Sequence, residues 1–121
     1  MPAHSPEQIH ELIAAALSAG DVDAFVELHE EDATTIVPTD GRQVSGHAAI
    51  RAAVGPIFAL RPTARIDVLG KLESHGLALT HARVRVTAEP SVDIDGRGTV
   101  VSRRQPDGTW RIVLDNPLTP E

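Results

Sequence analysis

The chain has 121 residues, no cysteine and a formal net charge of −6, with 17 acidic residues against 11 basic ones. This length predicts one domain over residues 1–121, and the lack of cysteine excludes disulfides, thiolate metal sites and cysteine nucleophiles. The negative charge and the low aromatic content of 2% argue against nucleic-acid binding.

The N-terminal residues show no basic segment followed by an apolar stretch, and no apolar run reaches the length that spans a bilayer. We therefore expect a cytoplasmic protein with no membrane partner. Arginine greatly outnumbers lysine, which indicates a GC-rich coding sequence and a bacterial source.

Helical patterns occur in the first half of the chain. Ser5 and Pro6 are typical of a helix start, and the helix is predicted to run to about Ala19 and to end at Gly20. A second helix is predicted after Asp21, with an apolar side made of Val22, Phe25, Val26 and His29. A third is predicted from Gly46 to Pro62, kinked or shortened at residues 55–56.

Strand patterns fill the rest. A short ribbon is predicted around the Asp40-Gly41 turn, followed by strands at 64–73, 77–88, 98–104 and 109–116. Residues 93–96 are interpreted as a turn, because the other ligand positions of a calcium loop are missing. Helices followed by a mostly antiparallel sheet indicate the α+β class.

The predicted sheet has two unlike faces. In the strand from Leu77, one side carries Ala78, Thr80, Ala82, Val84 and Val86, and the other carries Leu77, Leu79, His81, Arg83 and Arg85. In the last strand, Trp110, Ile112 and Leu114 alternate with Arg111, Val113 and Asp115. The pattern alone favours burying the apolar side against the helices and leaving the charged side to solvent.

Six histidines are scattered along the chain without the spacing of metal ligands, so we expect no metal and no cofactor. His10 is interpreted as a helix-surface residue. His29, on an apolar stripe, and His81, beside Arg83, are the candidates for acid/base chemistry, and for His29 a hydrogen-bonded core position is favoured.

Four segments together resemble the ketosteroid isomerase-like superfamily, also called nuclear transport factor 2-like: residues 20–21, 31–34, 44–50 and 107–112. The resemblance extends over about residues 6–116. It implies a cone-shaped fold with three N-terminal helices packed on a curved, mostly antiparallel sheet, and it implies a homodimer. It does not fix a function, because this fold hosts isomerases, cyclases, dehydratases, epoxide hydrolases and non-catalytic domains.

The resemblance also speaks against steroid isomerisation. Val37 stands where the steroid isomerases carry their proton-shuttling Asp, and Ile13 and Val100 stand where they carry the two groups that hold the enolate. That reaction needs a base and acids at these positions.

The same register turns His81, Arg83, Val113 and Asp115 toward the cavity of the cone, against the face pattern, so both orientations stay open. If the charged side faces inward, His81 and Asp115 are the predicted proton carriers and Arg83 the anion anchor. This arrangement is similar in type to the cofactor-free SnoaL-like polyketide cyclases.

The expected pocket is apolar and takes a small apolar ligand. Its predicted residues are Ile13, Leu17, Phe25, His29, Val37, Val54, Phe58, Val100 and Val113. The favoured function is that of a small-molecule pocket protein, acting as an acid/base enzyme of the cyclase, isomerase or hydratase type on an apolar carbonyl compound. The alternative is a non-catalytic ligand-binding or dimeric association domain.

Overall fold

The computed structural model describes residues 2–90 and 92–117. The helices are α1 (Pro6–Ala19), α2 (Val22–Glu27) and α3 (His47–Ala59), and the strands are β1 (His29–Ile36), β2 (Gln43–Ser45), β3 (Thr63–Ser74), β4 (Leu77–Ala88), β5 (Val92–Arg104) and β6 (Trp110–Asn116). The strands form one sheet in the order β2-β1-β6-β5-β4-β3. Neighbouring strands are antiparallel, except that β1 and β6 are parallel.

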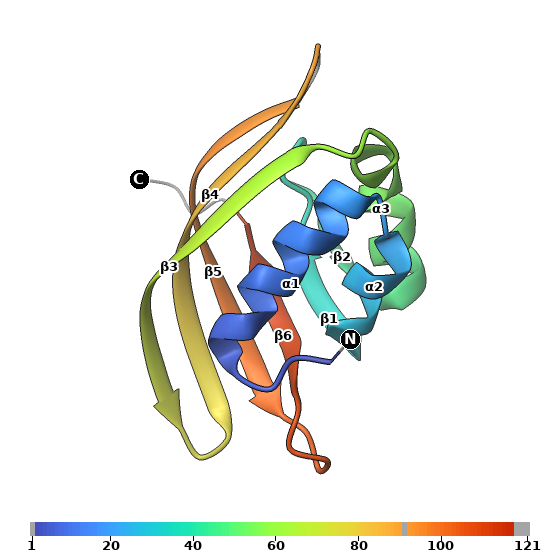
Figure 1. The fold of residues 1–121 in the computed structure, drawn as a ribbon. Helices are drawn as coiled ribbons and strands as arrows, with labels where there is room; N and C mark the ends of the chain where they lie inside the picture. The colour runs from blue at the N-terminus through green and yellow to red at the C-terminus, as the bar shows by residue number, and fades with distance from the viewer. Residues whose placement is uncertain (1, 91, 118–121) are drawn as a thin grey trace.

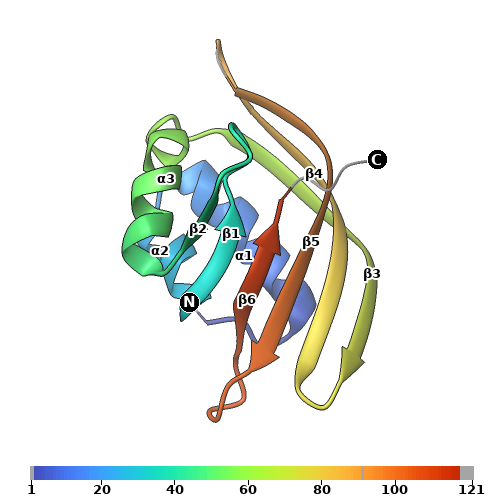
Figure 2. The same ribbon diagram turned by 180° about the vertical axis from the view of Figure 1, so that it is seen from behind.

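The three helices lie on the same side of the sheet. Figure 1 shows the long strands β3, β4 and β5 curving around α1, with α2 and α3 beyond it. Seen from behind, the other side of the strands carries none of the three helices (Figure 2). The predicted α+β cone, with helices on a curved and mostly antiparallel sheet, is confirmed.

Local capping signals fixed the first helix as predicted. The Ser5 hydroxyl accepts a hydrogen bond from the Gln8 N–H at 3.1 Å, and Gly20 ends the helix in the left-handed conformation with φ +69°. The Asp21 carboxylate in turn accepts from the Ala24 N–H at 3.0 Å and starts α2. These contacts form within four residues, which is why the sequence alone predicted them.

The second helix is shorter than expected, and His29 is not part of it. Helix α2 ends at Glu27, and His29 begins β1. The Leu28 carbonyl accepts a hydrogen bond from the Ile112 N–H at 2.7 Å, so pairing with β6 takes over from helical hydrogen bonding at this point. This boundary is decided by a contact between two residues that are 84 positions apart in the chain, so no local pattern could predict it.

Two other boundaries differ from the expectation. Helix α3 continues past Pro56 to Ala59, so the predicted shortening does not occur. Residues 93–96 lie in β5, where Val84 pairs with Gly96 and Arg85 with Asp95, so the predicted turn there is wrong. The Asp95 carboxylate accepts hydrogen bonds from Arg83 and Arg85 of β4, which supports the extended strand.

The hydrophobic core lies between the helices and the concave side of the sheet. Its most enclosed members include Ile9 of α1, Ile50 of α3 and Ile112 of β6, each with 0% exposure. Within the described residues, no helix has both the length and the apolar character needed to cross a membrane. The core is incomplete at one end of the cone, where a pocket opens.

Candidate functional site

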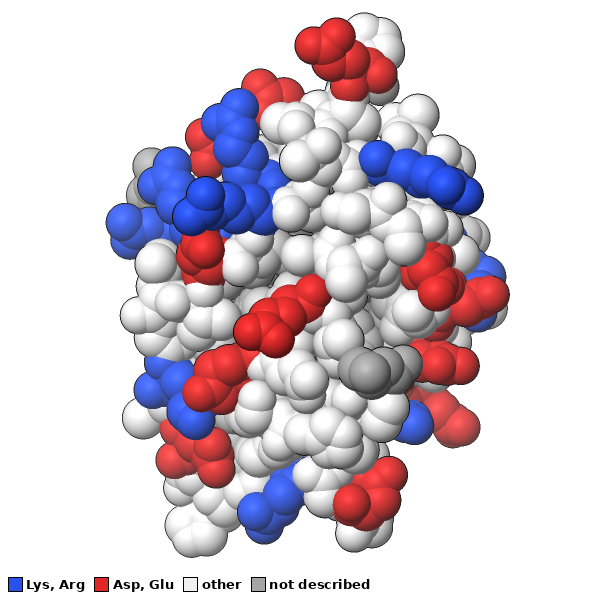
Figure 3. All heavy atoms as spheres, in the orientation of Figure 1, with Lys and Arg blue, Asp and Glu red and all other residues white. Residues whose placement is uncertain are grey.

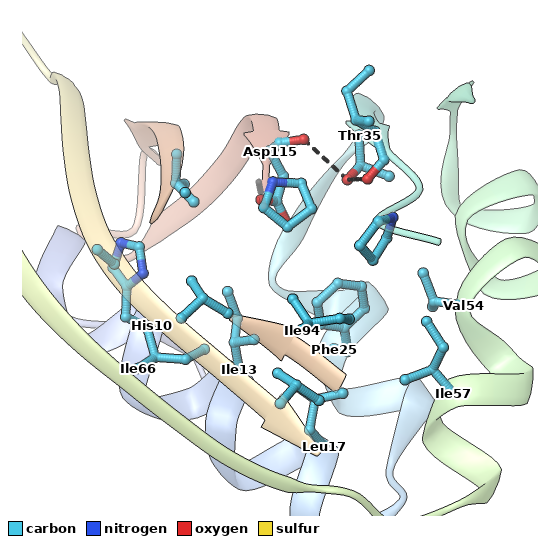
Figure 4. Close-up of a pocket in the computed structure, with 18 of the residues that line it drawn as sticks. His10, Ile13, Leu17, Phe25, Thr35, Val54, Ile57, Ile66, Ile94 and Asp115 are labelled. Carbon is cyan, nitrogen blue, oxygen red and sulfur yellow. Dashed lines mark hydrogen bonds between the residues drawn. The ribbon is translucent and has the colours of Figure 1, made fainter. Parts of the chain in front are cut away.

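The pocket lies between the three helices and the concave side of the sheet. The space between its lining atoms, open solvent at its mouth included, is about 730 Å³. Val54 and Ile57 of α3 face Ile66 and His10 across it (Figure 4). Thr99 borders the pocket with its hydroxyl beside His81 on the other side of the sheet. The polar side chains in the lining therefore come from α1, β1 and β6: His10, Thr35 and Asp115.

Most of the predicted pocket residues line this space: Ile13, Leu17, Phe25, Val54, Phe58 and Val100. Three do not. Val37 and His29 are buried at 1% and 0% exposure behind the pocket wall, and Val113 is half-buried in β6 outside the lining. Val37, the position that the resemblance matches to the isomerase base, is therefore not exposed to a ligand in the pocket.

His81 and Arg83 lie on the convex side of the sheet, so the expectation that they converge with Asp115 in the cavity is wrong. Both are exposed; His81 Nδ1 lies 3.2 Å from Thr99 Oγ1, and Arg83 donates to the Asp95 carboxylate at 3.2 Å. Basic side chains gather on the sheet side of the molecule in Figure 3. The alternation along β4 places its apolar residues inward, which leaves its charged residues to solvent.

Asp115 nevertheless faces the pocket, because β6 contains a β-bulge. Val101 of β5 pairs with Leu114, but the next residue, Ser102, pairs with Ile112, so Val113 is an extra residue on β6. The inserted residue reverses which side of the sheet the following side chains of β6 face. Leu114 is therefore 50% exposed, and Asp115 is only 8% exposed.

The bulge brings Asp115 beside His29. Asp115 Oδ2 lies 3.8 Å from His29 Nε2, which has no hydrogen-bond partner among the described residues although it is fully enclosed. His29 Nδ1 lies 2.9 Å from the Phe25 carbonyl oxygen, and a carbonyl only accepts, so Nδ1 carries a proton. At 3.8 Å the carboxylate is beyond hydrogen-bond distance of Nε2, so the two side chains are close neighbours that no direct hydrogen bond joins.

Two further hydrogen bonds hold the backbone on both sides of this pair. His47, in the first turn of α3, has its Nε2 2.8 Å from the His29 carbonyl oxygen. The Thr35 hydroxyl donates to the Asp115 carbonyl oxygen at 3.1 Å (Figure 4). Because β1 and β6 also pair here, with Thr35 opposite Asp115, the backbones of both residues are held in place.

His10 is the polar residue that the sequence interpretation missed. It is 3% exposed, not a surface residue, because it shares one face of α1 with Ile13 and Leu17. Its Nε2 lies 2.6 Å from Thr80 Oγ1 of β4. Burial lowers the pKa of His10, although the nearby carboxylates of Asp115 and Glu7 act to raise it, so the imidazole is neutral at neutral pH.

The site therefore places two groups around an apolar space: the Asp115 carboxyl group, with the His29 imidazole 3.8 Å behind it, and the neutral imidazole of His10. Such groups can take up and release a proton next to an apolar ligand. Among residues 2–90 and 92–117, no cluster of three or more His, Asp or Glu could hold a metal ion.

Comparisons with known proteins agree with this architecture. The family model of the SnoaL-like domain matches residues 9–114. A solved structure described as a calcium/calmodulin-dependent protein kinase type II association domain, from Thiobacillus denitrificans, is 22% identical with a TM-score of 0.78, covering 98% of this chain and 99% of that one. No protein with a curated functional description matches the sequence significantly.

Two other solved structures have the same fold. One, described as a ketosteroid isomerase from Parabacteroides distasonis, is 25% identical with a TM-score of 0.67, covering 92% of this chain and 84% of that one. The other, an NTF2-like protein of unknown function from Shewanella oneidensis, is 18% identical with a TM-score of 0.72, covering 90% and 92%.

Gly98 is predicted to be required for the position of the chain that follows Asp115. A Cβ atom at Gly98 would lie 2.6 Å from the Pro117 carbonyl oxygen, a contact that only a backbone shift relieves. We expect Gly98→Ala to lower the free energy of unfolding by about 1–3 kcal/mol, measured by urea denaturation. Gly70→Ala is the control, because a Cβ there meets nothing within 4 Å; equal effects of both substitutions would contradict this prediction.

The lowered pKa of His10 predicts that acid destabilises the protein. Below pH 6.5, its ordinary pKa, the unfolded chain binds a proton that the folded protein takes up only at lower pH. This contribution to the free energy of unfolding should be complete above pH 6.5 and be lost progressively as the pH falls toward the lowered value. Urea denaturation followed by Trp110 fluorescence at several pH values measures it.

His10→Asn should flatten this acid-side slope, because the asparagine does not titrate. His75→Asn, at an exposed turn, should leave the slope as it is. The same slope in both variants would mean that other groups cause the pH dependence.

Proposed function

This chain belongs to the family of SnoaL-like domains, and we propose that it is an enzyme that moves a proton on a small, apolar carbonyl compound. One observation carries the proposal: Asp115 is turned by the β6 bulge into an apolar pocket, with His29 behind it at 3.8 Å. Burying a carboxylate costs free energy unless the carboxylate is paired and hydrogen-bonded. Its position in this apolar pocket therefore favours an acid/base role over a structural one.

In the proposed reaction, the Asp115 carboxylate takes a proton from the carbon next to the ligand's carbonyl group. The C–H electron pair forms the C=C bond of an enolate, and the carbonyl π electrons move onto oxygen. Return of the proton to carbon, or attack of the enolate carbon within the same molecule, gives an isomerase or a cyclase reaction. His29 is a positioning residue here: its imidazole, held by the Phe25 carbonyl, lies 3.8 Å behind the carboxylate on the side away from the ligand.

The reaction needs no cofactor, because the carbonyl group itself stabilises the negative charge that develops. Lysine and arginine are absent from the described pocket lining, which favours neutral ligands over anionic ones. Arg83 and His81, on the convex side, take no part in the proposed reaction.

Hydrogen–deuterium exchange tests this proposal without knowledge of the natural substrate. Indanone, a small ketone whose carbonyl adjoins an aromatic ring, is incubated in deuterium oxide, and NMR follows loss of the signal of its exchangeable α-protons. We expect the protein to accelerate this loss, and Asp115→Asn to reduce the acceleration by about 100-fold or more, the typical contribution of a general base.

Asp95→Asn is the matched control for this experiment. Asp95 is also an ion-paired aspartate on the sheet, but it lies on the convex side with Arg83 and Arg85. The rate of α-proton exchange in indanone with Asp95→Asn should match the rate with the unmodified protein. No acceleration by the unmodified protein, or equal rates in both variants, would contradict an acid/base role for Asp115.

A second candidate function, dimeric association, is supported by a row of apolar residues on the convex side. In the strand register, Leu72 pairs with Leu79, Leu79 with Val101, and Val101 with Leu114, so the row crosses four adjacent strands. Leu72 is 72% exposed and Leu114 is 50% exposed. The solved structure from Thiobacillus denitrificans is described as an association domain. We propose that a second copy of this chain covers the row.

Sedimentation measurements over a range of concentrations test the association. The unmodified protein should be a dimer, and Leu72→Asp should weaken dimerisation at least about tenfold, because it would bury an unpaired carboxylate. Leu60→Asp, at an exposed position after α3, should leave the dimer intact. A monomer at all concentrations would contradict the association.

A further inference from the structure

Enolate formation needs a hydrogen-bond donor for the ligand's oxygen as well as a base, and the pocket offers few. Asp115 is the proposed base, and His29 does not line the pocket. The Thr35 hydroxyl already donates to the Asp115 carbonyl oxygen. His10 is left as the residue to consider, because it is 3% exposed, lines the pocket and comes from a different element.

The tautomer of His10 follows from its contact with Thr80. The Thr80 hydroxyl has one hydrogen and two acceptors within reach, His10 Nε2 at 2.6 Å and the Val100 carbonyl oxygen at 3.4 Å. Hydroxyl donors make bonds of about 2.7 Å, whereas N–H donors make longer ones of about 2.9 Å. The distance of 2.6 Å therefore favours donation from Thr80 to Nε2, and a neutral ring that accepts at Nε2 carries its proton on Nδ1.

The Nδ1 atom of His10 is free to act on a ligand. No residue in the described part of the chain makes a hydrogen bond to it. Among the described residues, the side-chain nitrogen and oxygen atoms that are both fully enclosed and without a hydrogen-bond partner are His29 Nε2 and Ser102 Oγ. His10 Nδ1 has no partner and is not one of these atoms, so it is not fully enclosed. Figure 4 shows the His10 ring at the pocket edge, near Ile13 and Ile66.

We propose that His10 is a second catalytic residue of this pocket, a neutral imidazole whose Nδ1–H donates a hydrogen bond to the carbonyl oxygen of the ligand. The inference rests on the proposed function, since it assigns the group that holds the oxygen while Asp115 holds the proton. It also narrows the ligand class to apolar compounds that present a hydrogen-bond acceptor.

A neutral imidazole suits this role because it donates without adding a charge to an apolar pocket. Thr80 acts on the ligand through His10: its hydroxyl occupies Nε2 and thereby fixes the proton on the opposite nitrogen. Thr80 is 0% exposed on the strand that carries Ala82 and Val84 of the pocket wall, so no bulk water competes for its hydroxyl.

Nitrogen NMR of the unmodified protein tests the tautomer directly, because protonated and unprotonated ring nitrogens have well-separated chemical shifts. We expect Nδ1 of His10 to be protonated and Nε2 to be unprotonated at neutral pH. Thr80→Val should remove this preference while keeping the side-chain volume. A proton on Nε2 in the unmodified protein would overturn the inference and leave the role of Asp115 untouched.

Calorimetric titration with indanone and indane tests the donor. The two probes share a ring skeleton, and only indanone has an acceptor. The ratio of their affinities should fall about fivefold or more in His10→Leu relative to the unmodified protein. In that variant the Thr80 hydroxyl can still donate to Val100, so no buried donor is left without a partner.

His4→Leu supplies the matched control, because His4 is exposed and outside the pocket. It should keep the affinity ratio of the unmodified protein. An unchanged ratio in His10→Leu, or no binding of indanone to the unmodified protein, would overturn the donor role. Donor behaviour of His10 without deuterium exchange would support this inference and refute the proposed reaction, so the two can fail separately.

Discussion

The parallel pairing of β1 with β6, together with the bulge at Val113, is the constraint on which the pocket depends. The pairing places the start of β1 beside β6, and the bulge then turns Asp115 to the same side as His29. Without the extra residue, strict alternation would put Asp115 on the convex side with Arg111. A change of one residue in register therefore decides whether the pocket is chemically inert or contains a carboxylate.

Burying that carboxylate has a cost that the surrounding residues offset. His29 lies 3.8 Å from the carboxylate, and hydrogen bonds from His47 and Thr35 hold the backbones of the two residues. The burial of His10 keeps its ring neutral despite the nearby carboxylate. One pocket thus contains a carboxyl group and a neutral imidazole from different elements.

The convex side of the sheet has a different character from the concave side. Arg83, Arg85 and Asp95 form ion pairs there, and the apolar row beginning at Leu72 lies farther along the same strands. These exposed ion pairs contribute little to stability. The exposed apolar row is the feature on which the proposed dimeric association rests, because contiguous exposed apolar surface is typical of interaction sites.

The sequence by itself determined the class of fold, the caps of α1 and α2, and most of the apolar pocket, because capping and hydrophobic alternation depend on neighbours a few residues apart. It also predicted the solvent side of β4 correctly from pattern alone. The helical spacing of His10 with Ile13 and Leu17 also indicates its burial, although only the fold supplies its partner Thr80, 70 positions away. Only the tertiary structure decided where His29 and Asp115 lie. His29 begins β1 because the Leu28 carbonyl accepts a hydrogen bond from β6, and Asp115 faces the pocket because of a β-bulge. These two placements depend on long-range pairing, which a single sequence does not encode in any local pattern.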